Sequence, residues 1–287
     1  MIPQFDLKKE YAFLEEEIQQ ELKDVFSKTN FIGGDNVNSL EKNVAKYIGV
    51  KYAISCNSGT DALHFALRSM NIGKGDEVIT TPFTFISTLE AIMYVGAKPV
   101  FADIDLETYN ISKKEILKKI NKKTKAIIPV HLFGNPFDIR DLKQEIGDKN
   151  IKIIEDCAQS FGSGINCQRV GGIGDIGCFS FYPTKNLGCY GDGGLVTTNS
   201  SEYGEWNDDI SNMQGEETTG LCYDYSASTV GGDVTAVLAN SSLQTATDST
   251  SCNNATRVIG SVALTSSLTM DDTVKGYQLN WRISNMG

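Results

Sequence analysis

The sequence has few residues of the kinds that build metal centres. It contains two histidines, His64 and His131, and its seven cysteines include no CxxC pair. Closely spaced cysteines and histidines are the usual signature of a structural zinc site. The spacing therefore predicts no metal site, and it favours a reducing compartment over a disulfide-stapled protein.

The sequence also lacks a long apolar run and an excess of basic residues. No stretch is long enough to span a bilayer, and the first residues lack the apolar core of a signal peptide. The formal net charge of −10 argues against nucleic acid or an anionic membrane as the main partner. These absences favour a cytoplasmic enzyme.

Lysine is absent between residues 186 and 274. That stretch holds one basic residue, Arg257, and twelve acidic residues, whereas the remainder of the chain has 25 basic and 24 acidic residues. Residues 200–273 are rich in serine, threonine, asparagine and glycine, with at most a short helix near 203–213. We expect an atypical acidic insert there, which is β-rich, disordered or foreign to the rest of the chain. A self-contained β module with a binding role is a further alternative.

Residues 1–199 alternate between short helices and strands, as is typical of an α/β fold. Two amphipathic helices are expected first, over residues 7–28 and 37–48. Strands are then expected at residues 52–56, 77–80, 99–103, 125–131, 151–156, 177–182 and 195–198. Helices are expected between them at 60–70, 87–94, 112–120 and 139–146. This alternation predicts a largely parallel sheet covered by helices.

One lysine follows the expected strand 177–182, just past Pro183, in a turn rich in glycine. This is Lys185. Open α/β sheets bind ligands at the carboxyl ends of their strands, and a buried lysine amine can become a nucleophile that forms a Schiff base. Taken alone, Lys185 is more simply interpreted as a surface residue of a loop, so its neighbours decide.

Two further groups follow other strands. Ser58, Gly59 and Thr60 lie between a strand and a helix, where backbone N–H groups and a hydroxyl can bind phosphate. Ser58 could equally be an ordinary helix cap. Asp156 ends a very apolar strand, so its carboxylate needs a partner. That partner can be a protonated ring nitrogen, or the residue can serve in a cap or salt bridge.

A third group, Thr81-Pro-Phe-Thr-Phe85, offers either an aromatic surface for stacking a ring or ordinary core packing. Together, a phosphate site, a carboxylate, an aromatic platform and a Schiff-base lysine at strand ends describe a pyridoxal phosphate site. In such a site Asp156 would keep the ring nitrogen protonated, and Lys185 would move a proton between carbon centres.

Several motifs resemble those of the DegT/DnrJ/EryC1/StrS family of sugar aminotransferases, which have the aspartate aminotransferase (type I) fold. The matching stretches are residues 57–63, 75–85, 96–101, 125–134, 154–162 and 179–186. The resemblance implies a three-layer sandwich around a mostly parallel mixed sheet, with residues 1–199 as the large domain that binds pyridoxal 5'-phosphate.

The resemblance also implies a role for each site residue. Lys185 would be the catalytic residue that holds the cofactor covalently, and Asp156 would pair with the pyridine nitrogen. Gln159 would lie by the phenolic oxygen, and Phe85 would stack on the ring. The residues that would bind the phosphate are Ser58, Gly59, Thr60 and Ser180.

The chain departs from the family pattern after residue 199. Residues 274–287 return to a family-like motif, in which Asn280 would reach the phosphate of a neighbouring subunit in a homodimer. Residues 200–273 are far longer than the family's connecting segment. The small C-terminal domain that follows in the family is largely missing, so the chain resembles a truncated member.

The implied reaction transfers an amino group from glutamate to a keto nucleotide sugar, for surface glycan or antibiotic sugar biosynthesis. One alternative is a sugar dehydratase of the same family, but those members have histidine where this chain has Lys185. Another is a catalytically inactive or regulatory relative that binds the cofactor without turning over a sugar.

Overall fold

The computed structural model describes residues 6–147, 149–205, 221–224 and 242–245. The chain divides into two units, one of residues 1–188 with 193–207 and the other of residues 189–192 with 208–287. In the second unit, β10 (Leu221–Asp224) pairs antiparallel with β11 (Ser242–Thr245). Most of the expected insert at 200–273, and the whole of 274–287 with Asn280, lie outside the described residues.

A seven-stranded sheet forms the centre of the first unit. Its strands are, in spatial order, β1 (Tyr52–Cys56), β9 (Gly194–Thr198), β8 (Ile176–Ser180), β5 (Lys152–Asp156), β4 (Thr124–Ile128), β2 (Glu77–Thr80) and β3 (Lys98–Phe101). Within this sheet only β9 runs antiparallel to its neighbours. The predicted α/β fold with a mostly parallel mixed sheet is therefore confirmed.

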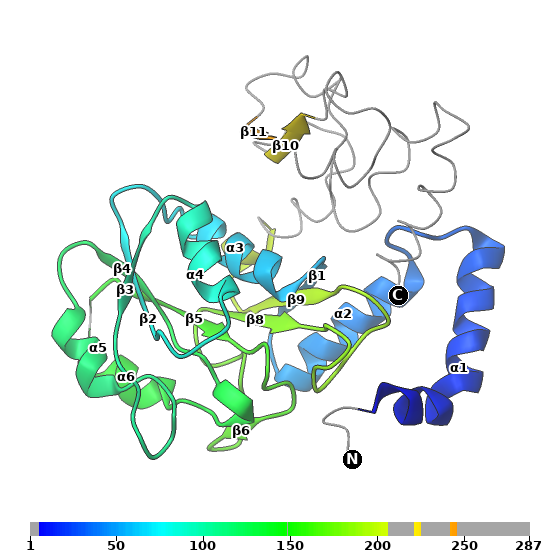
Figure 1. Cartoon of the computed structure of the whole chain (residues 1–287), viewed down its shortest axis with the longest axis horizontal. Helices are drawn as coiled ribbons and strands as arrows, with labels where there is room; N and C mark the ends of the chain where they lie inside the picture. The colour runs from blue at the N-terminus through cyan, green and yellow to red at the C-terminus, as the bar shows by residue number, and fades with distance from the viewer. Residues whose placement is uncertain (1–5, 148, 206–220, 225–241, 246–287) are drawn as a thin grey trace. The chain divides into compact units, whose positions relative to one another are not determined.

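Helices cover both faces of the sheet (Figure 1). The pair α3 (Gly59–Ser69) and α4 (Ser87–Tyr94) packs on one face, and α5 (Lys113–Lys119) with α6 (Ile139–Ile146) packs on the other. Successive strand residues point to opposite faces, and so Val78 belongs to the core under α3 and α4 while Ile79 belongs to the core under α5 and α6. Burial on both faces explains why these strands are apolar throughout.

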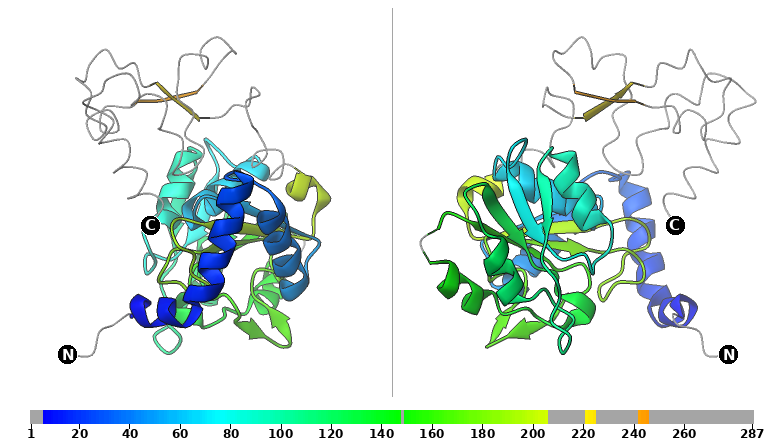
Figure 2. Two further views of the ribbon diagram at one scale, coloured as in Figure 1. Left: turned by 90° about the vertical axis from the view of Figure 1, so that its right-hand side faces the viewer. Right: turned by 60° about the vertical axis from the view of Figure 1, so that its left-hand side comes forward.

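Two helices precede the sheet, as the periodicity predicts. The second, α2 (Asp35–Ile48), buries Val44 and Ile48 and ends at Gly49, which has a left-handed conformation. The first, α1 (Leu7–Lys28), buries none of its residues, and Phe13 is 87% exposed. Figure 2 shows α1 at the periphery of this unit. No helix in the described part of the chain combines the length and the apolar character needed to cross a membrane.

Three strands end earlier than expected, and one of them is the strand expected over 99–103, which ends at Phe101. The strand expected over 125–131 ends at Ile128, directly before Pro129, and the one expected over 177–182 ends at Ser180. Proline has no N–H to continue a ladder, which explains why the strand ends at Ile128. The structure also contains a small hairpin that the sequence pattern did not reveal, β6 (Gly164–Ile165) with β7 (Gln168–Arg169).

Candidate active site

The predicted site residues lie at the edge of the sheet where its parallel strands end. Asp156 and Ser180 are the last residues of β5 and β8, which are adjacent and parallel. Gly59 begins the helix that follows β1, and Phe85 lies between β2 and α4. Ligands of open α/β sheets bind at this edge, so the fold brings together residues as distant in sequence as Gly59 and Ser180.

Two glycines allow the turn after β1 to lie against Ser180. Gly194, at the start of β9, is paired with Cys56 on one side and Ser180 on the other. A Cβ atom on Gly194 would overlap the carbonyl group of Ser58, and one on Gly59 would lie 2.7 Å from the Cβ of Ser180. Because neither side chain is present, the N-terminus of α3 lies directly beside the Ser180 side chain.

Ser58 caps helix α3, as one of the two sequence interpretations expected. Its hydroxyl oxygen accepts a hydrogen bond from the Asp61 N–H, 3.1 Å away. The Thr60 hydroxyl donates to the Ser87 hydroxyl at 2.8 Å. The N–H groups of Gly59 and Thr60 precede the first intrahelical hydrogen bond and so are free to bind an anion. Capping and anion binding are therefore compatible at this turn.

The Asp156 carboxylate is buried and has no ion pair within 4 Å in the described residues. One oxygen accepts from the Ala158 N–H at 3.1 Å, and the other accepts from the Thr88 hydroxyl at 2.8 Å. Burial raises the pKa of Asp156, whereas these two hydrogen bonds and, more weakly, His131 and Lys185 lower it. Burial outweighs these effects on the pKa, and the ionised carboxylate therefore needs a cationic partner at this position.

Thr88 belongs to the candidate site through its contact with Asp156, and the sequence interpretation missed it. It lies in the first turn of α4, is fully buried, and lies 2.9 Å from the Thr84 hydroxyl as well as hydrogen-bonding Asp156. Its contact with Asp156 joins elements 68 residues apart. The one available signal was a hydroxyl on a helix face that is otherwise apolar, through Ala91 and Ile92.

The other candidate residues differ in how firmly they are held. Gln159 accepts a hydrogen bond from the Phe133 N–H at 2.9 Å through its side-chain oxygen. Phe85 is 70% exposed, which excludes the core-packing interpretation and leaves its ring open for stacking. Lys185 is half-buried; its N–H donates to the Tyr182 carbonyl at 2.8 Å, and its amine makes no ion pair in the described part of the chain.

The structure also brings together three groups that sequence spacing did not connect, namely His131, Glu155 and Cys157. All are buried, and their potential ligand atoms lie within 4.8 Å of one another. Both ring nitrogens of His131 already have protein partners, since Nε2 lies 3.0 Å from Glu155 and Nδ1 accepts from the Phe137 N–H. Burial raises the pKa of the Cys157 thiol well above its usual value. His131 and Glu155 are thus already hydrogen-bonded within the protein.

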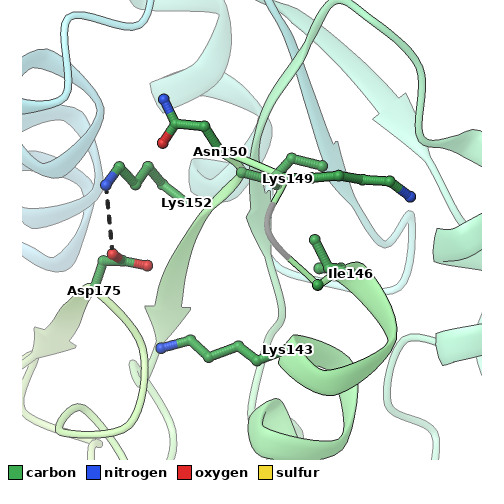
Figure 3. Close-up of a pocket in the computed structure, with 8 residues that line it drawn as sticks. Lys143, Ile146, Lys149, Asn150, Lys152 and Asp175 are labelled. Carbon is green, nitrogen blue, oxygen red and sulfur yellow. Dashed lines mark ion pairs between the residues drawn. The ribbon is translucent and has the colours of Figure 1, made fainter.

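A cavity of about 270 Å³ lies at the opposite end of β5 (Figure 3). Two of its lysines are paired with the protein, because Lys152 lies 3.8 Å from Asp175 and Lys143 donates to the Ile173 carbonyl at 2.9 Å. Figure 3 shows Lys152 pointing toward Asp175. This cavity lies at the amino end of the strand that carries Asp156 at its carboxyl end, so it is separate from the candidate site.

Comparison with known proteins identifies sugar aminotransferases as relatives. The chain is 48% identical over 201 residues to UDP-N-acetyl-3-dehydro-alpha-D-glucosamine 3-aminotransferase of Acidithiobacillus ferrooxidans, covering 70% of this chain and 54% of the relative. It is 42% identical over 202 residues to UDP-2-acetamido-2-deoxy-3-oxo-D-glucuronate aminotransferase of Pseudomonas aeruginosa, covering 70% and 56%. The chain thus spans about half the length of the curated relatives it matches.

A similar solved structure is that of NtdA from Bacillus subtilis with the bound cofactor PMP. The TM-score is 0.70 at 28% sequence identity, and the likeness covers 76% of this chain and 51% of NtdA. In sequence, residues 13–222 match the model of one protein family, which is more than half of the chain. The chain belongs to the DegT/DnrJ/EryC1/StrS aminotransferase family.

Proposed function

We propose that this chain is the cofactor-binding part of a pyridoxal phosphate-dependent aminotransferase that acts on a keto nucleotide sugar, with glutamate as the amino donor. The observation that carries the proposal is the buried Asp156 carboxylate, which has no ion pair among the described residues and whose pKa Lys185 helps to lower. A carboxylate in this state suits the protonated ring nitrogen of the cofactor.

The side chains at this edge of the sheet fit pyridoxal phosphate. The N–H groups of Gly59 and Thr60 can bind the phosphate group beside the Ser180 side chain, in a cradle that a Cβ on Gly59 would fill. The exposed ring of Phe85 can stack on the cofactor, and the Gln159 amide can reach its phenolic oxygen while Phe133 holds it. When bound, the cofactor supplies an electron sink for the substrate carbon.

The chain's own residues would hold and move protons around that ring. Asp156, ionised, stabilises a proton on the ring nitrogen, and Thr88 and Ala158 hold its carboxylate in place. The Nζ atom of Lys185 would hold the cofactor covalently, and the free amine would take up and return a substrate proton as a general base and acid.

The substrate class follows from the two relatives, whose names both specify a UDP-linked sugar with an oxo group at carbon 3. We propose the same class here, a nucleotide sugar that carries a ketone. We also propose that residues 1–199 form the large domain, that 200–273 are an insert, and that 274–287 contribute Asn280 to a neighbouring copy in a homodimer. Several exposed apolar side chains on α1 and the segment after it support an association surface on this unit, namely Phe13, Leu22, Phe26, Phe31 and Ile32.

The glutamate half-reaction tests this proposal. Purified protein loaded with pyridoxal phosphate is mixed with L-glutamate, and we expect loss of the visible band of the bound cofactor together with stoichiometric 2-oxoglutarate. D-glutamate is the matched control and should cause neither change. Protein that binds the cofactor but leaves L-glutamate unchanged would favour an inactive or regulatory relative.

Replacing Thr88 with valine should weaken cofactor binding. The change removes the hydrogen-bond donor to one Asp156 oxygen, and a hydrogen bond to a charged group contributes roughly 1.5–3 kcal/mol. We therefore expect a loss of about tenfold or more in affinity for pyridoxal phosphate, measured by titrating the visible band. Thr88→Ser keeps the hydroxyl and should retain most of the affinity, so equal binding by the two variants would contradict the assigned role.

A further inference from the structure

His131 and Glu155 form a fully buried pair next to Asp156, which follows Glu155 at the end of β5. Both side chains have no solvent exposure, and His131 Nε2 lies 3.0 Å from a Glu155 carboxylate oxygen. The other ring nitrogen, Nδ1, accepts a hydrogen bond from the Phe137 N–H at 3.0 Å. This assigns the proton of a neutral ring to Nε2, which therefore donates to Glu155.

Glu155 is held from a second side as well. Its oxygens accept hydrogen bonds from the N–H groups of Gly171, Ile173 and Gly174 at 2.6–2.9 Å. Burial by itself raises the pKa of Glu155, but the bonds from His131 and from this loop outweigh it and lower the pKa below its usual value. The carboxylate is thus ionised and joins the loop before β8 to the turn that contains His131.

That turn, residues 131–137, contacts two candidate site residues. The His131 N–H donates to the Asp156 carbonyl at 3.0 Å, and the Phe133 N–H donates to the Gln159 side-chain oxygen at 2.9 Å. Phe133 has a left-handed backbone, with φ of 54°. A non-glycine residue adopts this conformation when the surrounding structure enforces it, so the turn needs an anchor.

We propose that the His131–Glu155 pair positions the cofactor site: it anchors the 131–137 turn, and through that turn it fixes Asp156 and Gln159 without touching the cofactor. The inference rests on the proposed function, because it gives Asp156 and Gln159 their roles. His131 and Glu155 are positioning residues in this scheme. Comparable groups behind metal ligands change affinity about 10- to 100-fold when removed.

Two substitutions at His131 separate positioning from folding. His131→Gln can still donate from Nε2 to Glu155, whereas His131→Leu fills the space without a donor. We expect His131→Leu to bind pyridoxal phosphate about tenfold more weakly and to alter the visible circular dichroism of the bound cofactor. His131→Gln should restore most of both. In cofactor-free protein, amide hydrogen exchange of residues 156–161 should be faster in His131→Leu and close to wild type in His131→Gln.

The outcomes are distinct. A His131→Leu variant that has a lower unfolding temperature but wild-type affinity, circular dichroism and exchange would show a purely structural role and overturn the inference. If His131→Leu does not fold, His131→Asn replaces it, because asparagine can accept from Phe137 without reaching Glu155. Equal affinity of the Asn and Gln variants would then overturn it. Wild-type protein that fails to bind pyridoxal phosphate would instead contradict the proposed function itself.

Discussion

Replacing Lys185 with alanine is expected to abolish the covalent attachment of pyridoxal phosphate. The amine of this residue is the one nucleophile we assign to the carboxyl edge of the sheet, beside the buried Asp156. Without it the cofactor can bind only through its phosphate and ring, so the visible band of the protein-bound form should disappear after dialysis. Borohydride reduction of the loaded wild-type protein, followed by peptide mass spectrometry, should label the peptide that contains Lys185.

Two further variants test whether the loss of the band is due to the missing covalent bond at this lysine. Lys185→Arg keeps the positive charge near Asp156 but cannot form the covalent bond, and it should also lack the band. Lys152→Ala removes a lysine from the cavity at the opposite end of β5 (Figure 3) and should leave the band intact. A band that persists in Lys185→Ala, or a label on a different lysine, would show that the attachment site is elsewhere.

Asp156→Asn should change cofactor binding and stability in opposite directions. Asparagine keeps the shape of the side chain but cannot balance a protonated ring nitrogen. Loss of such a charge-assisted hydrogen bond costs roughly 1.5–3 kcal/mol, so we expect affinity for pyridoxal phosphate to fall about 10- to 100-fold. The glutamate half-reaction should slow at least as much, because the ring nitrogen is then no longer held in its protonated form.

The cofactor-free protein should become more stable with the same substitution. Burial raises the pKa of Asp156 in the folded state, so folded protein binds the proton more tightly than unfolded protein does. Stability therefore falls as pH rises from the unfolded pKa through the raised folded pKa, and at neutral pH the buried charge is a net cost. Asparagine removes that cost, and the unfolding temperature without cofactor should be higher than that of wild type at pH 7 but not at pH 4.

Asp138→Asn is the matched control for both measurements. Asp138 caps helix α6 on the other face of the sheet, and asparagine is an equally good cap. This control should leave cofactor affinity unchanged. Equal affinity of Asp156→Asn and Asp138→Asn would contradict the role we assign to Asp156.

The sequence predicts local features of this protein well and contacts between distant segments poorly. Helix α1 and the strand at 52–56 are where periodicity places them, because side-chain pattern determines which face of an element is buried. The position of Asp156 at a strand end follows from the same pattern, whereas the strand that ends at Ser180 was expected to continue to residue 182. Their roles toward a cofactor remain predictions.

What the sequence did not predict depends on side chains that meet across the fold. The contacts of Thr88 with Asp156 and of His131 with Glu155 join residues 68 and 24 positions apart. No spacing rule connects such pairs, since their proximity arises only when the strands align. The exposure of Phe85 is similar: an aromatic pair after a strand fits a core as well as a surface, and tertiary packing decides between them.

The antiparallel strand β9 has a consequence for the order in which the site is built. Edge strand β1 is joined to the sheet only through β9, whose residues come about 140 positions later in the chain. During synthesis, residues 52–60 must therefore wait for residues 194–198 before Gly194 can bring Ser58 and Gly59 against Ser180. Closing so long a loop is entropically slow. We expect the anion-binding corner of the site to be the last part of the sheet to assemble, after the strands that present Asp156 have already paired.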